Sequence, residues 1–330
     1  MQLVARHSSF RMSGASLFEE SRVHSAGLSR TVLNGWVEMN TLILKLGATG
    51  DVVRTSTLLH RLDGDVTWVT ADKNVPLLQN IGRPVRVFSW EQRKQAADRH
   101  YELVISLEDE TEVGSFLNTI SHGRVFGAYL DKQGQMQYSD DAQRWFDLSL
   151  ISRHGRAQAD RLKFLNRSTY QHLIFEGLGY TFGGEPYCLP PTSQDGLKGD
   201  VAISSVAGPV WPMKAWAYYA ELQAELERQG IKVNVLQTRP TLLQHLADVR
   251  GHRVLVSGDS LPMHLALGSG VYCVSIFTCT SPWEIHDYGL QTKLVSPLLG
   301  EFFYQRGFDV RATTAVGLKQ VLAAVLERLR

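Results

Sequence analysis

Residues 44–62, LKLGATGDVVRTSTLLHRL, place an acid where a strand-like apolar run changes into a helical pattern. Gly47 and Gly50 allow the backbone to turn tightly and allow a ligand to approach the chain closely. Asp51 follows in the first turn of the predicted helix, where the helix macrodipole favours a negative charge. Two interpretations stay open: Asp51 caps the helix, or it acts on a ligand held at the loop. The loop is not a Walker P-loop, because Lys45 precedes the glycines and no Gly-Lys-Ser/Thr follows them.

A lysine occupies a similar junction in residues 204–222, SSVAGPVWPMKAWAYYAEL. A predicted strand gives way to a loop, and Lys214 stands at the start of a helix predicted over 214–229. A cation at the start of a helix is disfavoured by the helix dipole. The position becomes favourable when an anion lies between the ammonium and free backbone N–H groups. The alternative is a solvated lysine beside the core residues Trp211 and Trp216.

Residues 254–270, VLVSGDSLPMHLALGSG, form a third junction of this kind. Between the predicted strand and the first turn of the next helix stand Gly258, Asp259, Ser260, Leu261, Pro262 and His264. A helix that opens near a proline presents free N–H groups to an anion. The acid and the hydroxyl beside His264 give this histidine a functional interpretation, and a purely structural role stays equally open.

A fourth polar group follows the next predicted strand, at the same edge of the sheet. It lies in FTCTSPWEIHDYG, residues 277–289, and comprises Thr280, Ser281, Glu284 and His286. These side chains could line the mouth of a pocket. They could equally be caps and turn residues, since Ser281-Pro282 is a typical helix start.

Two short motifs point to other chemistry and are set aside. Asp63-Gly64-Asp65 matches the Asp-x-Asp that binds a metal–nucleotide complex in many sugar transferases, but turn chemistry explains it between a helix end and a strand. We therefore expect no metal there. GDSL at 258–261 spells the nucleophile block of a hydrolase family that also needs a late Asp-x-x-His, for which this chain offers only HDYG. A hydrolase with Ser260 as nucleophile is kept as an alternative.

Strands and helices alternate around these junctions in two series. The first series contains predicted strands at 42–47, 66–71, 85–89, 102–107 and 124–130. The second contains strands at 201–206, 231–236, 253–257 and 271–277, with helices at 214–229, 241–249 and 262–268. Such alternation predicts α/β architecture, with two parallel sheets covered by helices. Ligands bind such sheets beyond the carboxyl ends of the strands, where all four junctions fall.

The boundaries of the parts follow from the same reading. Residues 1–40 show neither periodicity nor a turn pattern and are interpreted as an N-terminal extension of unsettled order. Residues 41–190 form the first Rossmann-like domain, with a helical insertion at about 141–182 in which Gly177 and Gly179 suit a helix cap. Residues 191–330 form the second domain, whose last helix, at 313–330, completes it or crosses back to the first.

Composition excludes some classes of function. The 34 Lys and Arg nearly cancel the 33 Asp and Glu, so no charge excess attracts nucleic acid or an anionic membrane nonspecifically. Three cysteines without metal-type or redox-type spacing favour a reducing, cytoplasmic location. No run reaches the roughly 18 apolar residues of a transmembrane span, which leaves peripheral contact with a membrane open.

Taken together, these segments resemble the ADP-heptose glycosyltransferases, the lipopolysaccharide heptosyltransferase family (glycosyltransferase family 9) of GT-B fold. The matching pieces are ILKLGATGDVVRTSTLL, WPMKAWAYYAEL, GDSLPMHLALGSGVYCVSIF and TSPWEIHDYG, in this order. The similarity spans about residues 41–325, and the motifs are specific as a set rather than singly.

The resemblance implies transfer of a heptose from ADP-heptose to an acceptor hydroxyl or amine, with inversion and without a metal or other cofactor. Asp51 matches the general base, and Lys214 matches the lysine on the diphosphate. The donor side would comprise Lys214, Ser204, Ser205, Gly258, Asp259, Ser260, Leu261, Pro262 and His264. The acceptor side of the cleft would comprise Lys45, Gly47, Ala48, Thr49, Gly50, Thr280, Ser281 and Glu284. The acceptor itself stays open among a saccharide, a protein and a small natural product.

Three features are particular to this chain. The family usually has a Gly-rich turn that carries an acid suited to the adenosine ribose, whereas this chain has QTRPTLL at residues 237–243. Leu261 stands where many members have Gly. Arg153, His154, Arg156 and Lys163 make a local basic cluster, for which a solvated helix face is the favoured interpretation over contact with an anion. Besides the hydrolase, a nucleotide-sugar-binding protein of the same fold without catalysis is the remaining alternative.

Overall fold

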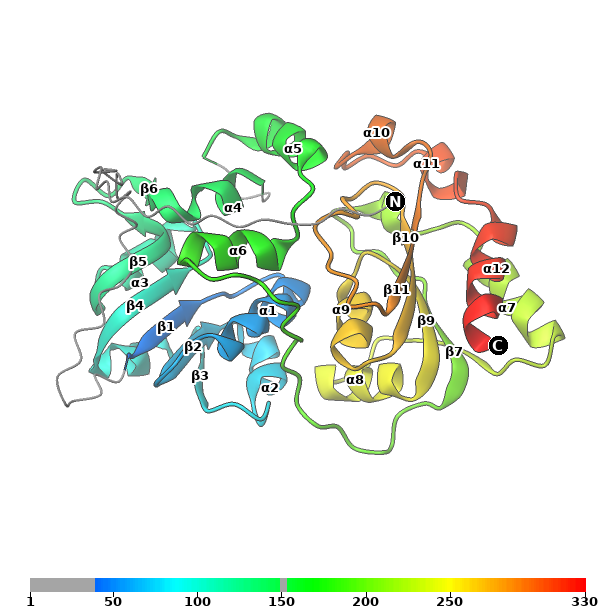
Figure 1. Ribbon diagram of the computed structural model, residues 1–330, viewed down its shortest axis with the longest axis horizontal. Helices are drawn as coiled ribbons and strands as arrows, with labels where there is room; N and C mark the ends of the chain where they lie inside the picture. The colour runs from blue at the N-terminus through cyan, green and yellow to red at the C-terminus, as the bar shows by residue number, and fades with distance from the viewer. Residues whose placement is uncertain (1–38, 149–152) are drawn as a thin grey trace, which may run out of the picture. The chain divides into compact units, whose positions relative to one another are not determined.

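Two largely parallel β-sheets, each covered by helices, lie side by side in the computed structural model (Figure 1). The structure describes residues 39–148 and 153–330, so the predicted N-terminal extension lies outside the described residues except for its last two positions. The described residues belong to one compact unit. The predicted α/β architecture with two sheets is confirmed, while the domain boundary near residue 190 stays a prediction.

The first sheet has the strand order β3-β2-β1-β4-β5-β6. Its strands are β1 (Thr41–Leu44), β2 (Val66–Thr70), β3 (Val85–Ser89), β4 (His100–Ser106), β5 (Ser121–Leu130) and β6 (Met136–Tyr138). The first five are parallel and agree with the predicted strands, whereas β6 pairs antiparallel with β5 and was not predicted. The helices of this half are α1 (Thr49–Thr55), α2 (Val75–Leu78), α3 (Thr111–Leu117), α4 (Gln143–Leu148), α5 (Arg156–Leu165) and α6 (Tyr170–Leu178).

The second sheet has the strand order β11-β10-β9-β7-β8 and is parallel throughout. Its strands are β7 (Gly199–Ser204), β8 (Val233–Val235), β9 (His252–Gly258), β10 (Tyr272–Phe277) and β11 (Gln291–Val295). Its helices are α7 (Tyr219–Arg228), α8 (Leu242–Arg250), α9 (Leu261–Gly268), α10 (Leu299–Phe302), α11 (Val310–Thr314) and α12 (Leu318–Leu329). Helix α12 packs on α7, β9 and β10, so it completes this half instead of crossing back to the first (Figure 1).

The helix predicted over 214–229 begins five residues later than expected. Lys214 ends a short 3-10 turn, Pro212–Lys214, and α7 starts only at Tyr219. The chain between them is held elsewhere, because the Ala217 N–H donates to the carbonyl of Thr313 and the Trp216 indole donates to that of Val316. Lys214 therefore does not lie at a helix N-terminus, and the argument from the helix dipole is wrong for this residue.

Glycines explain two further differences from the predicted helices. Gly179 caps α6 in the left-handed conformation at φ 84°, as predicted. Gly177 lies inside α6 instead, where an added Cβ would stand 2.4 Å from the carbonyl oxygen of Asp141. Close packing of α6 is thus the reason for this second glycine. The predicted helix over 313–330 is split, because Gly317 is extended (φ −74°, ψ 147°) and separates α11 from α12.

Apolar contacts between two pairs of helices join the halves. Helix α1 packs on α9, and α2 packs on α8. Val53 of α1 and Leu77 of α2 are buried in the same hydrophobic cluster as Leu246 and Leu265 of the second half. This contact brings the carboxyl end of β1 close to the amino end of α9.

A buried ion pair fixes the loop that follows β1. Lys45 follows β1 directly, Glu108 stands two residues after the end of the neighbouring strand β4, and Lys45 Nζ lies 2.9 Å from Glu108 Oε1. The same oxygen accepts the backbone N–H groups of Leu46 at 2.6 Å and Gly47 at 3.0 Å. Glu108 therefore orients the glycine loop and neutralises the lysine beneath it.

We expect Glu108→Ala to lower the free energy of unfolding by about 3–5 kcal/mol, because it leaves Lys45 buried without a counter-charge. Urea unfolding measures the change, and the exposed Glu91→Ala serves as the control, for which a change within about 0.5 kcal/mol is expected. Equal effects of the two substitutions would contradict a role for the buried pair.

Candidate functional site

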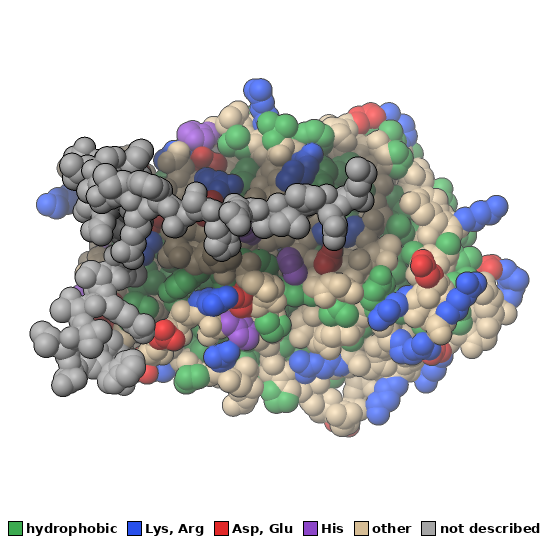
Figure 2. Space-filling model, in the orientation of Figure 1, with side chains coloured by type: hydrophobic (Ala, Val, Ile, Leu, Met, Phe, Trp, Pro, Cys, Tyr) green, Lys and Arg blue, Asp and Glu red, His purple; other side chains and the backbone are tan. Residues whose placement is uncertain are grey.

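Two adjoining cavities open where the carboxyl ends of both sheets face each other. The main cavity has a volume of about 450 Å³ and is lined from both halves of the chain. The second cavity, of about 210 Å³, lies in the second half and shares Trp211, Lys214, Asp259 and Ser260 with the main one. Figure 2 shows acidic, basic and histidine side chains around the hollow between the halves.

The positions of the cavities follow from the order of the strands. In the first sheet the order reverses between β1 and β4, and in the second between β7 and β9. Loops diverge at such a switch point and leave a crevice beyond the strand ends. Lys45 follows β1 at the first switch point, while Ser204 and Gly258 end β7 and β9 at the second.

Most of the residues singled out from the sequence line one of these cavities. The main cavity is bounded by Lys45, Ala48, Thr49, Gly50, Asp51, Lys214, Asp259, Ser260, Leu261, His264, Ser281 and Glu284. The second cavity adds Ser204, Ser205 and Gly258. Gly47, Pro262 and Thr280 are not among the lining residues. Gly47 is bonded to Glu108, and Pro262 and Thr280 are buried.

Asp51 is held by Arg54, one helical turn further along α1. Arg54 Nε and Nη2 lie 3.0 and 2.8 Å from Asp51 Oδ1. Within the described residues no hydrogen bond reaches Oδ2, and 32% of the side chain is exposed. Burial opposes ionisation, but Arg54, Lys45 and His264 together lower the pKa of Asp51. The group is thus a carboxylate at neutral pH, with one oxygen anchored and the other free toward the cavity.

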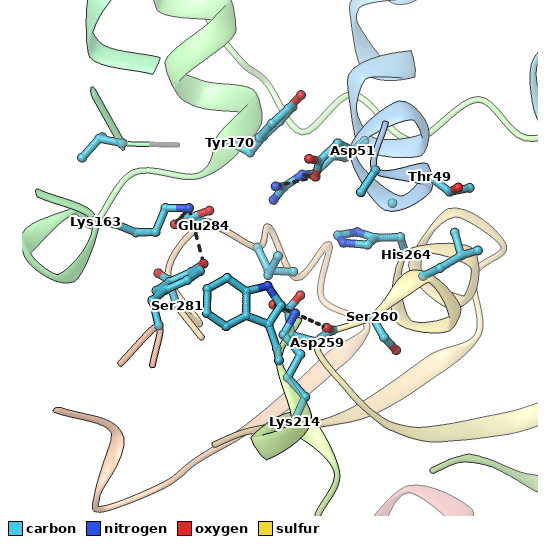
Figure 3. A pocket seen from close by; sticks show the side chains of 18 of the residues that line it. Thr49, Asp51, Lys163, Tyr170, Lys214, Asp259, Ser260, His264, Ser281 and Glu284 are labelled. Atoms are coloured by element: carbon cyan, nitrogen blue, oxygen red, sulfur yellow. Dashed lines mark hydrogen bonds and ion pairs between the residues drawn. The ribbon is translucent and has the colours of Figure 1, made fainter. Parts of the chain in front are cut away.

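Lys214 is held by Asp259 on the opposite side of the cavity (Figure 3). Its Nζ lies 3.0 Å from Asp259 Oδ2 and 2.7 Å from the Asp259 carbonyl oxygen. Although burial opposes ionisation, Lys214 and His264 hold the pKa of Asp259 well below its usual range. A lysine has three N–H donors, so one remains for an anion that enters the cavity.

His264 lies between these two charged pairs. It is buried at the start of α9, and its Nδ1 lies 3.4 Å from the hydroxyl of Tyr187. An added Cβ on Gly50 would come within 2.8 Å of the imidazole, which explains a glycine at this point of α1. Burial, assisted by the charge of Arg54, lowers the pKa of His264 to about 4. His264 is therefore neutral at pH 7.

Lys163 corrects the interpretation of the basic cluster. This lysine of α5 is buried, and its Nζ lies 3.3 Å from Glu284 Oε1 and 3.4 Å from the Tyr304 hydroxyl. A solvated helix face is therefore wrong for Lys163. Arg153 and His154 instead face Asp147, 3.5 and 3.3 Å away, while Arg156 is exposed.

The hydrolase alternative is not supported by the geometry around Ser260. Its hydroxyl donates to the carbonyl of Gly258 at 3.3 Å, and no hydrogen bond joins it to a histidine in the described ranges. His286 of the HDYG segment accepts the N–H of Tyr288 and packs edge-on against Phe182. Segment 281–290 also forms turns rather than the helix that Ser281-Pro282 suggested.

QTRPTLL has a structural role at the start of α8. Thr241 and Gln244 form a reciprocal capping box there. Arg239 Nε lies 2.8 Å from Oδ2 of the fully buried Asp248.

Further observations bear on the expected cofactor and location. Between residues 39 and 330, apart from 149–152, no three His, Cys, Asp or Glu side chains gather as metal ligands would. No helix in the same ranges combines the length and apolar character needed to cross a bilayer. The three cysteines are free, and the cytoplasmic location stays a prediction.

Sequence reasoning missed several residues that line the main cavity. Arg54 carried a signal, since a basic residue three positions after an acid on a helix can pair with it. Trp211 was noted only as a core residue, and Tyr304, whose ring lies 5.1 Å from that of Trp211, stands in a segment without a motif. Only the tertiary fold brings Tyr304 to this wall.

Comparison with known proteins gives matches only among solved structures. No protein-family model matches the sequence, and neither does any curated protein. The glycosyl transferase family 9 structure from Veillonella parvula is similar at a TM-score of 0.62 and 17% identity, over 88% of this chain and 97% of that one. Escherichia coli heptosyltransferase WaaC with ADP is similar at 0.59 and 15% identity, over 88% and 100%. E. coli ADP-heptose lipopolysaccharide heptosyltransferase II is similar at 0.56 and 15% identity, over 88% and 98%.

These likenesses establish the fold. The chain has the two-sheet GT-B architecture of the family 9 heptosyltransferases, so the resemblance stated from the sequence motifs is confirmed at the level of the fold. WaaC has been solved with ADP and also with ADP-2-deoxy-2-fluoro heptose.

We expect the depressed pKa of His264 to make the protein less stable in acid. The unfolded chain binds a proton at this histidine below about pH 6.5, whereas the folded protein does so only near pH 4. Stability is therefore full above pH 6.5 and falls toward pH 4, by about 2–3 kcal/mol from this group.

Urea unfolding at pH 7.5 and pH 4.5 measures this loss in the wild type and in His264→Gln. The variant should lose less stability over this interval than the wild type, whereas His172→Gln, at an exposed position, should lose as much. An identical pH dependence of the wild type and His264→Gln would exclude a neutral, buried imidazole.

Proposed function

We propose that this protein is an inverting, metal-independent glycosyltransferase that moves a heptose from ADP-heptose to a hydroxyl or amine of an acceptor. The observation that carries the proposal is the placement of Asp51 and Lys214. They come from different halves of the chain and line one cavity, with an ionised carboxylate on one wall and an ammonium on the other. A transfer reaction needs a base for the acceptor and a cation for the leaving group, which fits this pair.

In this proposal the donor lies at the carboxyl end of the second sheet. Lys214 would bind the diphosphate through the N–H that Asp259 leaves free, and Ser204, Ser205 and Gly258 would line the neighbouring space for the rest of the nucleotide. WaaC, which shares the fold, has been solved with ADP and with an ADP-heptose analogue, and this supports an ADP-sugar as donor.

The acceptor would approach from the side of α1. Its oxygen or nitrogen attacks the anomeric carbon of the sugar, its proton passes to Asp51 Oδ2, and the bond from the anomeric carbon to the diphosphate oxygen breaks. The products are the glycosylated acceptor and ADP. Arg54 anchors Oδ1 and keeps the carboxylate ionised, so that Oδ2 is ready to accept the proton.

The leaving diphosphate gains negative charge as this bond breaks. Lys214 is already fixed in place by Asp259, so it can stabilise that charge without first being ordered. The same role falls to a divalent cation in other transferases, and the proposal assigns it here to the lysine. The aromatic wall of Trp211 and Tyr304 would help exclude water, which would otherwise hydrolyse the donor.

A thermal-shift screen of nucleotide sugars tests the donor. We expect ADP-heptose to raise the melting temperature by several degrees, because saturation at 100 times Kd adds about 2.7 kcal/mol to the stability of the folded state. UDP- and GDP-sugars should shift it less. Lys214→Ala should lose most of the shift, and Lys319→Ala, an exposed lysine on α12, should keep it. No shift with any nucleotide sugar would refute the proposal.

Asp51→Asn separates catalysis from binding. The amide keeps the shape of the side chain but cannot accept the proton, so we expect transfer to fall by roughly 10²–10⁴-fold while the thermal shift with the donor is retained. Glycosylation of candidate acceptors with radiolabelled ADP-heptose measures the transfer. An unchanged rate would exclude Asp51 as the base. Donor binding without turnover in the wild type, across all acceptors tried, would instead favour the non-catalytic binding protein.

A further inference from the structure

One wall of the main cavity is built by the turn that follows β10. Ser281 and Glu284 of this turn line the cavity, although only 2% of Ser281 and 7% of Glu284 are exposed. The turn is tied to the first half of the chain, since the N–H of Tyr170 at the start of α6 donates to the Glu284 carbonyl at 3.0 Å. The two side chains therefore have fixed positions.

An oxygen of each side chain lacks a hydrogen bond. Among the described residues, no hydrogen bond reaches Ser281 Oγ. Lys163 Nζ lies 3.3 Å from Glu284 Oε1 and forms an ion pair with it, whereas no hydrogen bond within the described ranges reaches Glu284 Oε2. Polar groups of buried residues are nearly always hydrogen-bonded, so the unbonded Ser281 hydroxyl and the second Glu284 oxygen on a cavity wall indicate a ligand that completes them.

The chemistry of the two groups restricts this ligand. A carboxylate accepts hydrogen bonds from hydroxyl groups and repels a phosphate, and a serine hydroxyl both donates and accepts. The Lys163 ammonium is held by Glu284 and Tyr304, and only 5% of its side chain is exposed, against 18% for Lys214, so it offers an anion in the cavity less access. The subsite thus suits a neutral group with neighbouring hydroxyls.

Its position selects one part of a nucleotide sugar. Glu284 lines the same cavity as Arg54 and Asp259. Burial raises the pKa of Glu284, although the charges of Lys163 and Arg54 oppose this. Figure 3 shows Glu284 beside Lys163, across the cavity from His264. Glu284 therefore lies near both the carboxylate–arginine pair and the lysine assigned to the diphosphate. The group between the reacting oxygen and the diphosphate is the transferred sugar.

We propose that Ser281 and Glu284, with Glu284 positioned by Lys163, hydrogen-bond the hydroxyl groups of the donor's sugar and select it. This inference rests on the proposed function, because it takes the ligand to be a nucleotide sugar. It assigns these two residues to the donor rather than to the acceptor side of the cleft.

Calorimetric titration of ADP and of ADP-heptose into the same protein tests the subsite. The wild type should bind ADP-heptose more tightly than ADP. Ser281→Ala and Glu284→Gln should each weaken ADP-heptose about tenfold and leave ADP unchanged. The matched controls Ser115→Ala and Glu221→Gln, both at exposed positions, should change neither affinity.

A second measurement starts from the wild type, so its main result does not depend on whether the variants fold. Monodeoxy analogues of ADP-heptose are titrated into the wild type, where loss of at least one sugar hydroxyl should weaken binding about tenfold. The same analogue should lose little further affinity in a folded Glu284→Gln or Ser281→Ala protein, because the partner of that hydroxyl is already gone.

The outcomes separate the two proposals. Binding of neither ADP nor ADP-heptose to the wild type would refute the proposed function. Binding of both, with ADP-heptose affinity unchanged in the two variants and in the deoxy series, would refute the subsite alone. An equal loss of ADP and ADP-heptose affinity would also refute it, because it would place these residues at the nucleotide.

Discussion

Every cation that lines the main cavity, among the described residues, is held by its own acid. The pairs are Lys45–Glu108 at 2.9 Å, Arg54–Asp51 at 2.8 Å, Lys163–Glu284 at 3.3 Å and Lys214–Asp259 at 3.0 Å. A charge removed from water is tolerated only with a partner, so the pairing is a condition for building a charged cavity at all. It also means that the cavity does not attract anions through a net positive charge. An anionic ligand must be recognised by donors that the pairs leave unused.

The pairs also determine which parts of the chain move together. Two of them lie within the first half and fix the glycine loop and α1, and one lies within the second half and fixes Lys214. Among these four pairs, Lys163–Glu284 is the one that joins the two halves, beside the apolar contacts of α1 with α9 and α2 with α8. The cavity is therefore preorganised on each wall by local pairs, and its width is set by contacts between the walls.

The fold was largely predictable from the sequence, because alternating apolar runs of strand and helix length leave few arrangements other than parallel sheets. The prediction of a helix over 214–229 was wrong at its start, because long-range hydrogen bonds from Ala217 and Trp216 overrode the local pattern.

For the cavity, the loops at the strand ends led to Asp51, Lys214, Asp259 and His264, since topology alone brings such loops together. Lys163 and Tyr304 could not be found in this way. Their burial depends on contacts of α5 with Glu284 and with the segment after α10, which no local pattern encodes.

Two half-buried acids with lowered pKa values face the same cavity, and their hydrogen bonds assign them different roles. Asp259 Oδ2 and its own carbonyl both bind one ammonium, and 16% of its side chain is exposed. Asp51 is bound through Oδ1 only, by a residue of its own helix, and twice that fraction is exposed at 32%. A carboxylate that is locked onto the cation assigned to the leaving group cannot take a proton without weakening that cation's position. A carboxylate with one anchored and one free oxygen can take a proton while Arg54 keeps it in place. The structure therefore favours Asp51 over Asp259 as base because of the partners of each oxygen, although both acids are ionised at neutral pH.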